Sequence, residues 1–459
     1  MKKKIAVFGT GYVGLVTAVG LADIGHDVFA VDIDRTRVKD LKKGYLPFYE
    51  PGLKKIMKTV ITAGKIHFSS ESDKAVNRSD VIFIAVGTPP LEDGRADLSQ
   101  LRNAVDCVIE DLDSSKVIII KSTVPPGTID ALKELHSAEL ESTKSEIVFC
   151  PEFLREGTAV HDFYHPDRLV IGSDSDTAAR IVDDIFFPVV GKRDVPVLKC
   201  SPVSAEMIKY SSNVMLAARI AVMNELAEMS ETVGSDIIEI AAGVGLDSRI
   251  GNSFLNAGPG FGGSCFGKDV SGLVTAAAAR GVELGLIREI LTSNDKQRLR
   301  PALRLEKAVG SLRGKKIAVL GLAFKAETDD VRGSAAFDVI EYLTEKGAQV
   351  KAHDPLAEYN FIRDFKKKGY SCTELVEDAL KKADAAIILT EWKEYRNLSP
   401  ECLAGCMKGR VIIDSRNIID VNAFRSEGFT VFGTGMVEVK PKLKSRNRSD
   451  FMNAAIVSM

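Results

Sequence analysis

The chain has 459 residues, of which 45% are hydrophobic and 27% charged, and this ordinary globular composition excludes a largely disordered chain. Its 61 basic and 63 acidic side chains give a net charge of -2, which leaves no electrostatic footprint for nucleic acid or an anionic membrane. At roughly 100–200 residues per domain, the length predicts about three domains.

The sequence favours a cytoplasmic protein. No apolar run approaches the roughly 20 residues that a membrane-spanning helix needs. Glycines at 9, 11 and 14 interrupt the apolar start, which argues against a signal peptide. The seven cysteines are scattered and odd in number, as expected of reduced thiols, and their spacing predicts no metal site.

The first part of the chain alternates short apolar runs with longer amphipathic stretches. Such a βαβ series predicts a parallel, doubly wound α/β sheet, and we assign it to a domain at 1–200. The predicted strands are Ile5–Phe8, Val28–Val31, Val81–Val86, Val117–Ile120, Ile147–Phe149 and Leu169–Ile171.

The pattern becomes helical near Cys200. Ser204–Val233 is free of Gly and Pro and predicts one long helix, and helical sequence continues to about Val309 with a glycine-rich break at Gly258–Gly263. We assign 201–312 to a central helical domain that is either a dimerisation surface or simply a connector.

The α/β alternation then starts again. Lys316–Gly321 repeats Lys4–Gly9 almost residue for residue, and further strands are expected at Val350–His353, Ala386–Leu389 and Val411–Ile413. A second Rossmann-like domain is therefore predicted at 313–437. The remaining residues, 438–459, show no clear period and are interpreted as a flexible tail.

The motif Gly9-Thr-Gly-Tyr-Val-Gly14 lies between a predicted strand and a predicted helix. In such a turn the first glycine permits the tight bend, the second lets backbone approach a pyrophosphate and the third allows close packing of helix on sheet. Asp32 ends the next predicted strand, where a carboxylate accepts hydrogen bonds from ribose hydroxyls and repels a 2′-phosphate. The motif predicts NAD as cofactor, although Arg35 and Arg37 nearby qualify the preference over NADP.

Two later segments, Val86–Pro90 and Lys121–Gly127, follow predicted strands and fit either ligand-binding loops or plain turns. The second turn, at Gly321, lacks the full glycine pattern, so its capacity to bind phosphate is less certain. Asp354 is equally compatible with a ribose contact and a packing or capping role.

The glycine-rich stretch Gly258–Asp269 contains Cys265. A helix expected to begin near Asp269 and the adjacent Lys268 would both favour the thiolate, so we interpret Cys265 as a nucleophile. A nicotinamide cofactor together with a reactive thiol points to aldehyde oxidation. The thiolate adds to the carbonyl, hydride loss gives a thioester, and water releases an acid.

Lys209 and Asn213 are four residues apart and share a helix face, where they could hold an oxyanion or simply face solvent. The carboxylates of Glu152 and Glu156 follow a predicted strand, so they could act as bases for water or be ordinary loop charges.

Several segments, in order along residues 5–417, resemble the UDP-glucose 6-dehydrogenase family within the wider UDP-glucose/GDP-mannose dehydrogenases. They are GTGYVGLV, VGTPP, KSTVPPGT, PEFLREGTA, GPGFGGSCFGKD, GLAFKAETDDVRGSA and Arg416. The resemblance implies two Rossmann-like domains joined by a long central helix, the second domain holding mostly the UDP portion, in a homodimer. It also implies oxidation of UDP-glucose to UDP-glucuronate with two NAD+ reduced per turnover.

Roles carried over from the family remain implications of that resemblance. The catalytic set is Cys265, Lys209, Asn213, Asp269, Thr123 and Glu156. The NAD contacts are Gly9, Gly11, Tyr12, Val13, Gly14, Asp32, Arg37, Thr88, Thr123, Glu156, Lys268 and Arg332. The substrate contacts are Glu152, Phe153, Leu154, Arg155, Lys209, Asn213, Arg249, Phe254, Leu255, Asn256, Gly258, Gly262, Lys325 and Arg416.

Alternative functions stay open at this point. Relatives apply the same chemistry to UDP-N-acetylmannosamine or GDP-mannose, although Gly14-Leu-Val16 looks more like the UDP-glucose branch. A two-electron 3-hydroxyacid dehydrogenase would share the lysine and asparagine but would not need Cys265. A regulator that binds NAD or a sugar nucleotide without turnover would need none of the catalytic set.

Overall fold

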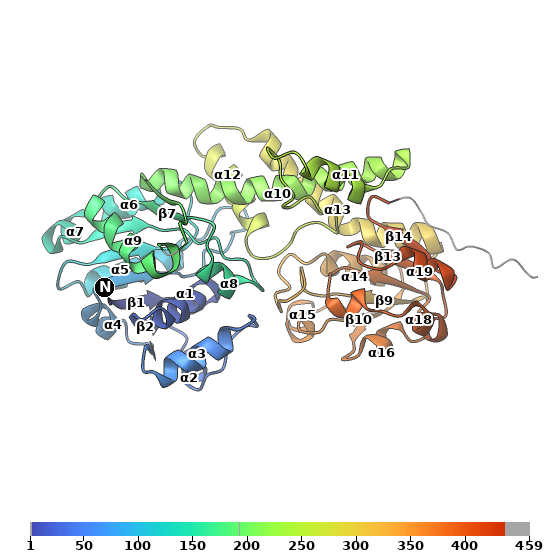
Figure 1. Cartoon of the computed structure of the whole chain (residues 1–459), viewed down its shortest axis with the longest axis horizontal. Helices are drawn as coiled ribbons and strands as arrows, with labels where there is room; N and C mark the ends of the chain where they lie inside the picture. The colour runs from blue at the N-terminus through green and yellow to red at the C-terminus, as the bar shows by residue number, and fades with distance from the viewer. Residues whose placement is uncertain (1, 192, 437–459) are drawn as a thin grey trace, which may run out of the picture. The chain divides into compact units, whose positions relative to one another are not determined.

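The computed structural model describes residues 2–191 and 193–436 (Figure 1). The chain forms two compact units. Unit 1 comprises the chain from its start to Arg219 with Phe261–Asn294 and Ala326–Gly333, and unit 2 comprises Ile220–Gly260, Asp295–Lys325 and the chain from Ser334 onward. The predicted domain boundaries at 200/201 and 312/313 stay predictions, and the predicted tail at 438–459 lies outside the described residues.

Unit 1 is built on an eight-stranded sheet in the order β3-β2-β1-β4-β5-β6-β7-β8. The strands are β1 (Lys4–Phe8), β2 (Asp27–Val31), β3 (Ile66–Ser69), β4 (Val81–Ile84), β5 (Val117–Ile120), β6 (Glu146–Phe149), β7 (Leu169–Gly172) and β8 (Val197–Cys200). Every neighbouring pair is parallel except β6 and β7, which are antiparallel. The predicted doubly wound α/β sheet is confirmed, with this one reversed pair.

Helices cover both faces of that sheet. The helices of unit 1 are α1 (Tyr12–Asp23), α2 (Arg35–Lys42), α3 (Leu53–Thr62), α4 (Ser72–Arg78), α5 (Ser99–Glu110), α6 (Thr128–Leu135), α7 (Ser137–Thr143), α8 (Ala159–Tyr164), α9 (Asp176–Val190) and, further along the chain, α12 (Phe266–Ala278). One apolar cluster packs α1, α3, α8 and α9 against the sheet, and a second packs α4, α5 and α6 against it. Strands buried on both faces explain why β4 and β5 are continuous runs of Val, Ile and Phe.

The predicted long helix is confirmed as α10 (Pro202–Val233), whose proline occupies the first helical position, where its missing N–H costs nothing. Helices α11 (Ile237–Gly245) and α13 (Gly285–Val309) complete the helical part of the chain. Residues of α10 and α13 contribute to both units, because one unit boundary falls inside each of these helices, after Arg219 and after Asn294.

Unit 2 contains a six-stranded parallel sheet in the order β11-β10-β9-β12-β13-β14. Its strands are β9 (Lys316–Leu320), β10 (Gln349–His353), β11 (Tyr370–Cys372), β12 (Ala385–Ile388), β13 (Val411–Asp414) and β14 (Thr430–Gly433). Its remaining helices are α14 (Ala335–Glu345), α15 (Glu358–Asp364), α16 (Val376–Leu380), α17 (Lys393–Arg396), α18 (Pro400–Cys406) and α19 (Val421–Ser426). The predicted second Rossmann-like sheet is thus confirmed.

All seven cysteines are free thiols. Among residues 2–191 and 193–436, no helix combines the length and the apolar character that crossing a bilayer requires.

Candidate active site

The first glycine turn joins β1 to α1. Gly9 has φ +90°, a conformation that disfavours any side chain, and its N–H donates to Val31 O at 2.8 Å. A Cβ on Gly14 would lie 1.9 Å from the Gly9 oxygen, so only glycine fits where helix meets turn. A Cβ on Gly11 would meet nothing within 4 Å, which leaves one open face at the amino end of α1.

Asp32 follows β2 beside this turn. Its carboxylate accepts from the Thr10 N–H at 2.8 Å and the Thr10 hydroxyl at 2.6 Å, and pairs with Arg37 Nη1 at 3.0 Å. Burial alone would raise the pKa of the Asp32 carboxyl, but these hydrogen bonds and the Arg37 charge lower it. Asp32 is therefore a firmly ionised acceptor.

This arrangement fits a dinucleotide. The amino end of α1, where Gly11 supplies no side-chain cap, offers unpaired N–H groups and a partial positive charge to phosphates, and its open face admits them. The ionised Asp32 suits ribose hydroxyls. Tyr12 and Val13 begin α1, but the Tyr12 hydroxyl is already committed, since it donates to the buried Glu50 carboxylate. The predicted contact Thr88 is buried and donates to Thr123 O at 2.9 Å, joining the loops after β4 and β5.

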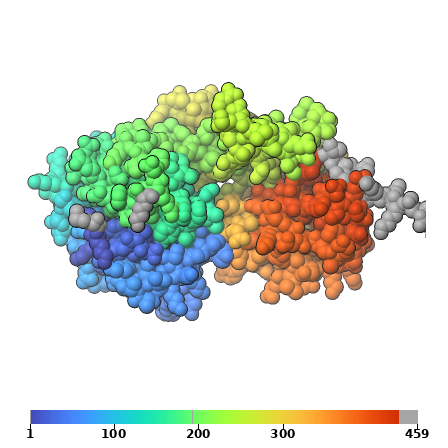
Figure 2. Space-filling model, in the orientation of Figure 1, coloured from blue at the N-terminus to red at the C-terminus, as the bar shows by residue number. Residues whose placement is uncertain are grey.

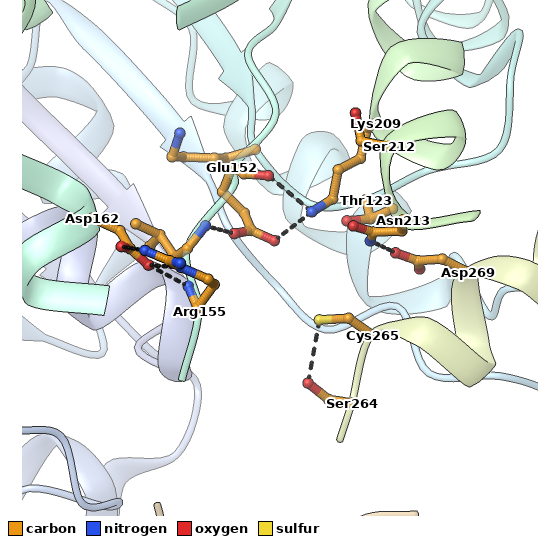
Figure 3. A network of polar contacts seen from close by, with 12 residues as sticks. Thr123, Glu152, Arg155, Asp162, Lys209, Ser212, Asn213, Ser264, Cys265 and Asp269 are labelled. Atoms are coloured by element: carbon orange, nitrogen blue, oxygen red, sulfur yellow. Dashed lines mark hydrogen bonds and ion pairs between the residues drawn. The ribbon is translucent and has the colours of Figure 1, made fainter. Parts of the chain in front are cut away.

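Lys209 and Glu152 form a buried ion pair. Lys209 Nζ lies 3.0 Å from Glu152 Oε1 and donates to the Glu152 backbone oxygen at 2.9 Å, and both side chains are about 5% exposed or less (Figure 3). Burial would lower the pKa of the Lys209 ammonium, but Glu152 and other nearby acidic groups raise it; burial would raise the pKa of Glu152, but Lys209 lowers it. Both groups are thus charged, and neither is a solvated surface residue.

Asn213 is the next residue on the same face of α10. Its Nδ2 donates to Asp269 Oδ2 at 2.5 Å, and Lys268 Nζ contacts Asp269 Oδ1 at 2.5 Å. Asn213 and Asp269 are buried. The helix spacing therefore brings Lys209 and Asn213 to one site, as predicted, and each is held there by a carboxylate.

Cys265 caps the amino end of α12, which begins at Phe266 and not near Asp269 as predicted. The predicted lowering of its pKa is wrong. Loss of water around the thiol and the nearby Glu152 carboxylate together raise its pKa to about 11, although the Lys209 charge opposes them. The charge of Lys268 is directed to Asp269 at 2.5 Å, which explains why the adjacent lysine does not produce a thiolate.

Glu156 lies on the other side of the thiol loop. Its Oε1 accepts from Ser264 Oγ at 3.0 Å and lies 3.4 Å from Arg332 Nη2, and Arg332 is itself held by Asp330 at 2.6 Å. Burial and the neighbouring Asp330 raise the pKa of Glu156 to about 8. A carboxyl group with that pKa is suited to accept and return a proton near neutral pH.

The other predicted residues of this strand end lie beside Glu152, and Lys209 Nζ is 5.3 Å from the Phe153 ring centre. Arg155 pairs with Asp162 through Nη2–Oδ1 at 2.5 Å, and the Arg168 guanidinium stacks 3.9 Å from the Phe153 ring centre. Glu152, Phe153, Leu154 and Arg155 line one pocket (Figure 3 shows Glu152 between the Arg155–Asp162 pair and Lys209). Substrate contacts by Phe153, Leu154 and Arg155 stay predictions.

Unit 2 contains most of the remaining predicted substrate contacts. Arg416 donates to the backbone oxygens of Leu389 at 2.9 Å and Phe324 at 2.8 Å, which fixes its guanidinium beside Gly258. Gly258 is anchored through its N–H to Asn224 Oδ1 at 2.8 Å. The unit therefore brings the Gly258 segment and Arg416 together, although they are far apart in sequence.

The other predicted substrate contacts near Gly258 differ in backbone conformation and in exposure. Phe254 adopts φ +62°, a strained conformation for a bulky residue, as found at functional positions. Leu255 is buried in a small cluster with Met223 and Ile237, so its side chain serves packing. Arg249 is 86% exposed and pairs with Asp247. The remaining predicted contacts in these segments are Asn256, Gly262, which lies in unit 1, and Lys325, whose ammonium lies 5.4 Å from the Phe324 ring centre.

Three polar residues in unit 1 were missed by sequence reasoning. Ser264 was overlooked although it adjoins Cys265 in the glycine loop. Glu50 holds Tyr12 and the Gly157 N–H, at 2.8 Å for the latter. Glu206 accepts from the N–H groups of Gly127 and Ile129, at 2.6 and 2.9 Å, and its position one helical turn before Lys209 was the available signal.

Comparisons with known proteins show the family of the chain. Profiles of the UDP-glucose/GDP-mannose dehydrogenase family match residues 3–190 (NAD binding domain), 203–296 (central domain) and 318–421 (UDP binding domain). UDP-glucose 6-dehydrogenase TuaD of Bacillus subtilis is 41% identical over 98% of this chain and 95% of its own, and UDP-glucose 6-dehydrogenase of Rhizobium meliloti is 40% identical over 94% and 99%.

Solved structures show the same relationship. A UDP-glucose dehydrogenase from Pyrobaculum islandicum superposes with a TM-score of 0.87 at 36% identity, covering 95% of this chain and 98% of that one. The UDP-D-ManNAc dehydrogenase of Pyrococcus horikoshii gives 0.83 at 29% identity, covering 95% and 100%. The glycine turn, the buried lysine and asparagine and the thiol loop thus lie in a chain that belongs to the UDP-glucose/GDP-mannose dehydrogenase family and carries its NAD-binding domain.

Proposed function

We propose that this chain oxidises UDP-glucose to UDP-glucuronate in two steps, through a thiohemiacetal and a thioester on Cys265. The observation that carries the proposal is the cluster of the half-buried Cys265 with the buried Lys209, Asn213 and Asp269, in the unit that also holds the dinucleotide turn. A two-electron alcohol dehydrogenase would need no thiol at that place.

The buried Lys209 ammonium and the buried Asn213 amide give the cluster its chemistry. In a site with little water, the fixed charge of the Lys209 ammonium and the fixed dipole of the Asn213 amide stabilise negative charge that develops on the substrate oxygen. Glu152 and Asp269 hold them in place, at 3.0 and 2.5 Å. When NAD+ is bound by the Gly9–Gly14 turn and Asp32, it supplies the hydride acceptor.

The hydrolytic half requires a base near the thioester. Glu156, with its raised pKa, is the proposed base for water, and Thr123 on the loop after β5 is proposed to orient that water. We also retain Lys268 and Arg332 as proposed NAD contacts, although their charges are compensated here by Asp269 and Asp330.

The substrate is proposed from the relatives. Those named UDP-glucose dehydrogenases are 36–41% identical to this chain, whereas the UDP-D-ManNAc dehydrogenase of Pyrococcus horikoshii is 29% identical. UDP-N-acetylmannosamine is therefore the second candidate, and GDP-mannose the third. The residues proposed to contact the sugar nucleotide are Arg249, Phe254–Gly258, Lys325 and Arg416.

We further propose a cytoplasmic homodimer. Val222, Leu226, Met229 and Val233 lie along one face of α10, spaced by three or four residues, and are 41–59% exposed. The yellow-green surface in Figure 2 belongs to this part of the chain. A Met229→Lys variant should be monomeric in sedimentation equilibrium. Leu375→Lys also replaces an exposed apolar side chain by a charged one, but it lies outside α10 and should leave the dimer intact. A dimer that survives Met229→Lys would contradict this assignment.

A Cys265→Ser variant tests the enzymatic proposal. Steady NADH production from UDP-glucose should fall by at least about a thousandfold, because a neutral hydroxyl does not form the thioester. Calorimetric binding of NAD+ and UDP-glucose should persist. Turnover at the wild-type rate would contradict the thioester mechanism, and activity confined to UDP-N-acetylmannosamine or GDP-mannose would contradict the substrate.

A further inference from the structure

Ser264 lies between a thiol and a carboxylate in unit 1. Its Oγ is 3.5 Å from Cys265 Sγ and 3.0 Å from Glu156 Oε1, and Figure 3 draws the contact between Ser264 and Cys265 as a dashed line. Both distances are within hydrogen-bond range for the atoms concerned. The three side chains therefore form one continuous line of polar atoms from the sulfur to a buried carboxylate.

The direction of these hydrogen bonds follows from the number of protons available. A serine hydroxyl has one proton, and Ser264 donates it to Glu156 Oε1. The contact with Cys265 must then have the S–H group as donor and Ser264 Oγ as acceptor. Cys265 S–H thus donates to Ser264 Oγ, and the Ser264 O–H donates to Glu156 Oε1. If both protons shift together, the net result is transfer of one proton from the sulfur to the carboxylate.

The thiol needs such a path because its surroundings do not ionise it. Each cation close to it is engaged by a carboxylate: Lys209 by Glu152, Lys268 by Asp269 and Arg332 by Asp330, at 3.0, 2.5 and 2.6 Å. Burial accordingly raises the pKa of Cys265 to about 11. At neutral pH the group is a thiol, and a thiol attacks a carbonyl well only if a base takes its proton.

Glu156 has the properties of that base. Its second oxygen, Oε2, is buried and receives no hydrogen bond from the described part of the chain. Burial and Asp330 raise its pKa to about 8, so the fraction of Glu156 that is ionised near neutral pH is a stronger base than an exposed carboxylate. Asp330 thus acts as a positioning residue, since it holds Arg332 and makes Glu156 readier to accept a proton.

We propose that Ser264 is a further catalytic residue, which relays the Cys265 proton to Glu156 as the sulfur attacks the aldehyde. This inference rests on the proposed function. The S–H bond breaks while the S–C bond forms, and the carbonyl electron pair moves to oxygen. The proton ends on Glu156, and it must pass to solvent before Glu156 can act as the base for water. Loss of hydride to NAD+ then restores the C=O bond as a thioester, so the charges of the carboxylate and of NAD+ are both neutralised.

The test measures thiol reactivity without any substrate. The full-length protein is treated with iodoacetamide at pH 7.5, and alkylation of the Cys265 peptide is followed by mass spectrometry. Ser264→Ala and Glu156→Gln should each slow it at least about tenfold, because general-base assistance is lost. Ser264→Thr keeps a hydroxyl and should restore most of the rate. Exposed Cys402 should react equally in every variant and serves as the internal control.

The double variant distinguishes a relay from two separate effects. If Ser264 and Glu156 act in one path, Ser264→Ala combined with Glu156→Gln should be no slower than the slower single variant. Multiplying effects, or wild-type alkylation of Ser264→Ala, would overturn the relay. Because no nucleotide sugar is present, this result is independent of whether UDP-glucose is the substrate.

The rate of aldehyde oxidation provides a second test of the relay. With a UDP-sugar 6-aldehyde and NAD+, Ser264→Ala should oxidise the aldehyde at least about tenfold more slowly, with the KM for NAD+ unchanged. Failure of the wild-type enzyme on this substrate would count against the proposed function. A wild-type rate for Ser264→Ala on it would count against the relay alone.

Discussion

The first turn of each unit uses the same backbone geometry for different purposes. Gly9 and Gly321 both have positive φ, at +90° and +107°, and each donates its N–H to the end of the neighbouring strand, at Val31 and His353. In unit 1 the helix α1 begins at Tyr12, three residues after Gly9. In unit 2 the next helix, α14, begins only at Ala335, and its N-cap residue Ser334 donates to Ala323 O, close to the turn, at 3.3 Å.

Asp32 and Asp354, the acidic residues that follow β2 and β10, also differ in their surroundings. Asp32 accepts from Thr10 at one edge and pairs with the half-exposed Arg37 at the other. Asp354 is enclosed: it accepts from the N–H groups of Leu322 and Ala323 at 2.8 and 3.0 Å, and from the Trp392 indole at 3.3 Å. Asp354 therefore has the packing and capping role, although the sequence of β9, earlier in unit 2, nearly repeats that of β1 in unit 1.

The largest expected effect comes from Gly14→Ala. Its Cβ would meet backbone at 1.9 Å, so the helix must shift, and we expect unit 1 to lose at least about 3 kcal/mol. Gly11→Ala, in open space, should keep its melting temperature but raise the Kd for NAD+ at least about tenfold. Thermal unfolding and calorimetric titration would check both. Equal melting temperatures for the two variants would contradict the assigned roles.

The paired variants Asp32→Asn and Asp354→Asn sharpen the comparison further. Each loses hydrogen bonds between backbone N–H and a carboxylate, worth about 2 kcal/mol of stability. Only Asp32→Asn should also weaken NAD+ binding, by about tenfold. Denaturant unfolding and NAD+ titration of both proteins are needed. A weakened NAD+ affinity in Asp354→Asn would mean that the second turn also takes part in cofactor binding.

A pH titration should distinguish unit 1 by its buried acid. The folded pKa of Glu156, about 8, lies above its ordinary value, so the folded state favours the protonated form. The associated stability is present below about pH 4.5 and is lost as pH rises toward 8. Glu156→Gln should remove this loss. Hydrogen exchange in β1 and β4 at pH 5 and pH 8, compared between wild type and variant, measures it; an identical pH dependence would contradict the buried protonated carboxyl.

The smallest structural effect is expected at Arg249. Its side chain is 86% exposed and pairs with Asp247, so Arg249→Ala should leave the melting temperature unchanged. If Arg249 contacts the nucleotide sugar, the KM for UDP-glucose should rise about tenfold while kcat stays the same. Arg363→Ala, another exposed arginine of unit 2, serves as the control. An unchanged KM would remove Arg249 from the proposed substrate contacts.

Sequence reasoning found the interior of both sheets and missed their margins. The strands that were not predicted, β3, β8, β11 and β14, are the outermost strands of the two sheets. An edge strand is covered less completely, and β8 (Val197–Cys200) accordingly has no fully buried residue. Continuous runs of Val and Ile identify strands only where both faces are buried. The reversed β6–β7 pair was missed because strand direction leaves no trace in composition.

For the site, residue spacing in the sequence predicted correctly which side chains lie together, but the charges of neighbouring residues did not predict the pKa of Cys265. The four-residue interval between Lys209 and Asn213 placed both on one face of α10, and the glycine pattern located the dinucleotide turn. The thiol was misjudged because Lys268 was counted as free charge, whereas it is paired with Asp269 at 2.5 Å. Such pairing depends on side-chain geometry, which the linear sequence does not specify.

The central claim is that one site performs two successive oxidations. The direct measurement mixes the purified protein with excess NAD+ and a limiting, known amount of UDP-glucose, and counts the NADH formed. The account predicts two NADH for each sugar consumed. One NADH for each sugar would mean that the reaction ends at the aldehyde, which would contradict the thioester and the role assigned to Cys265.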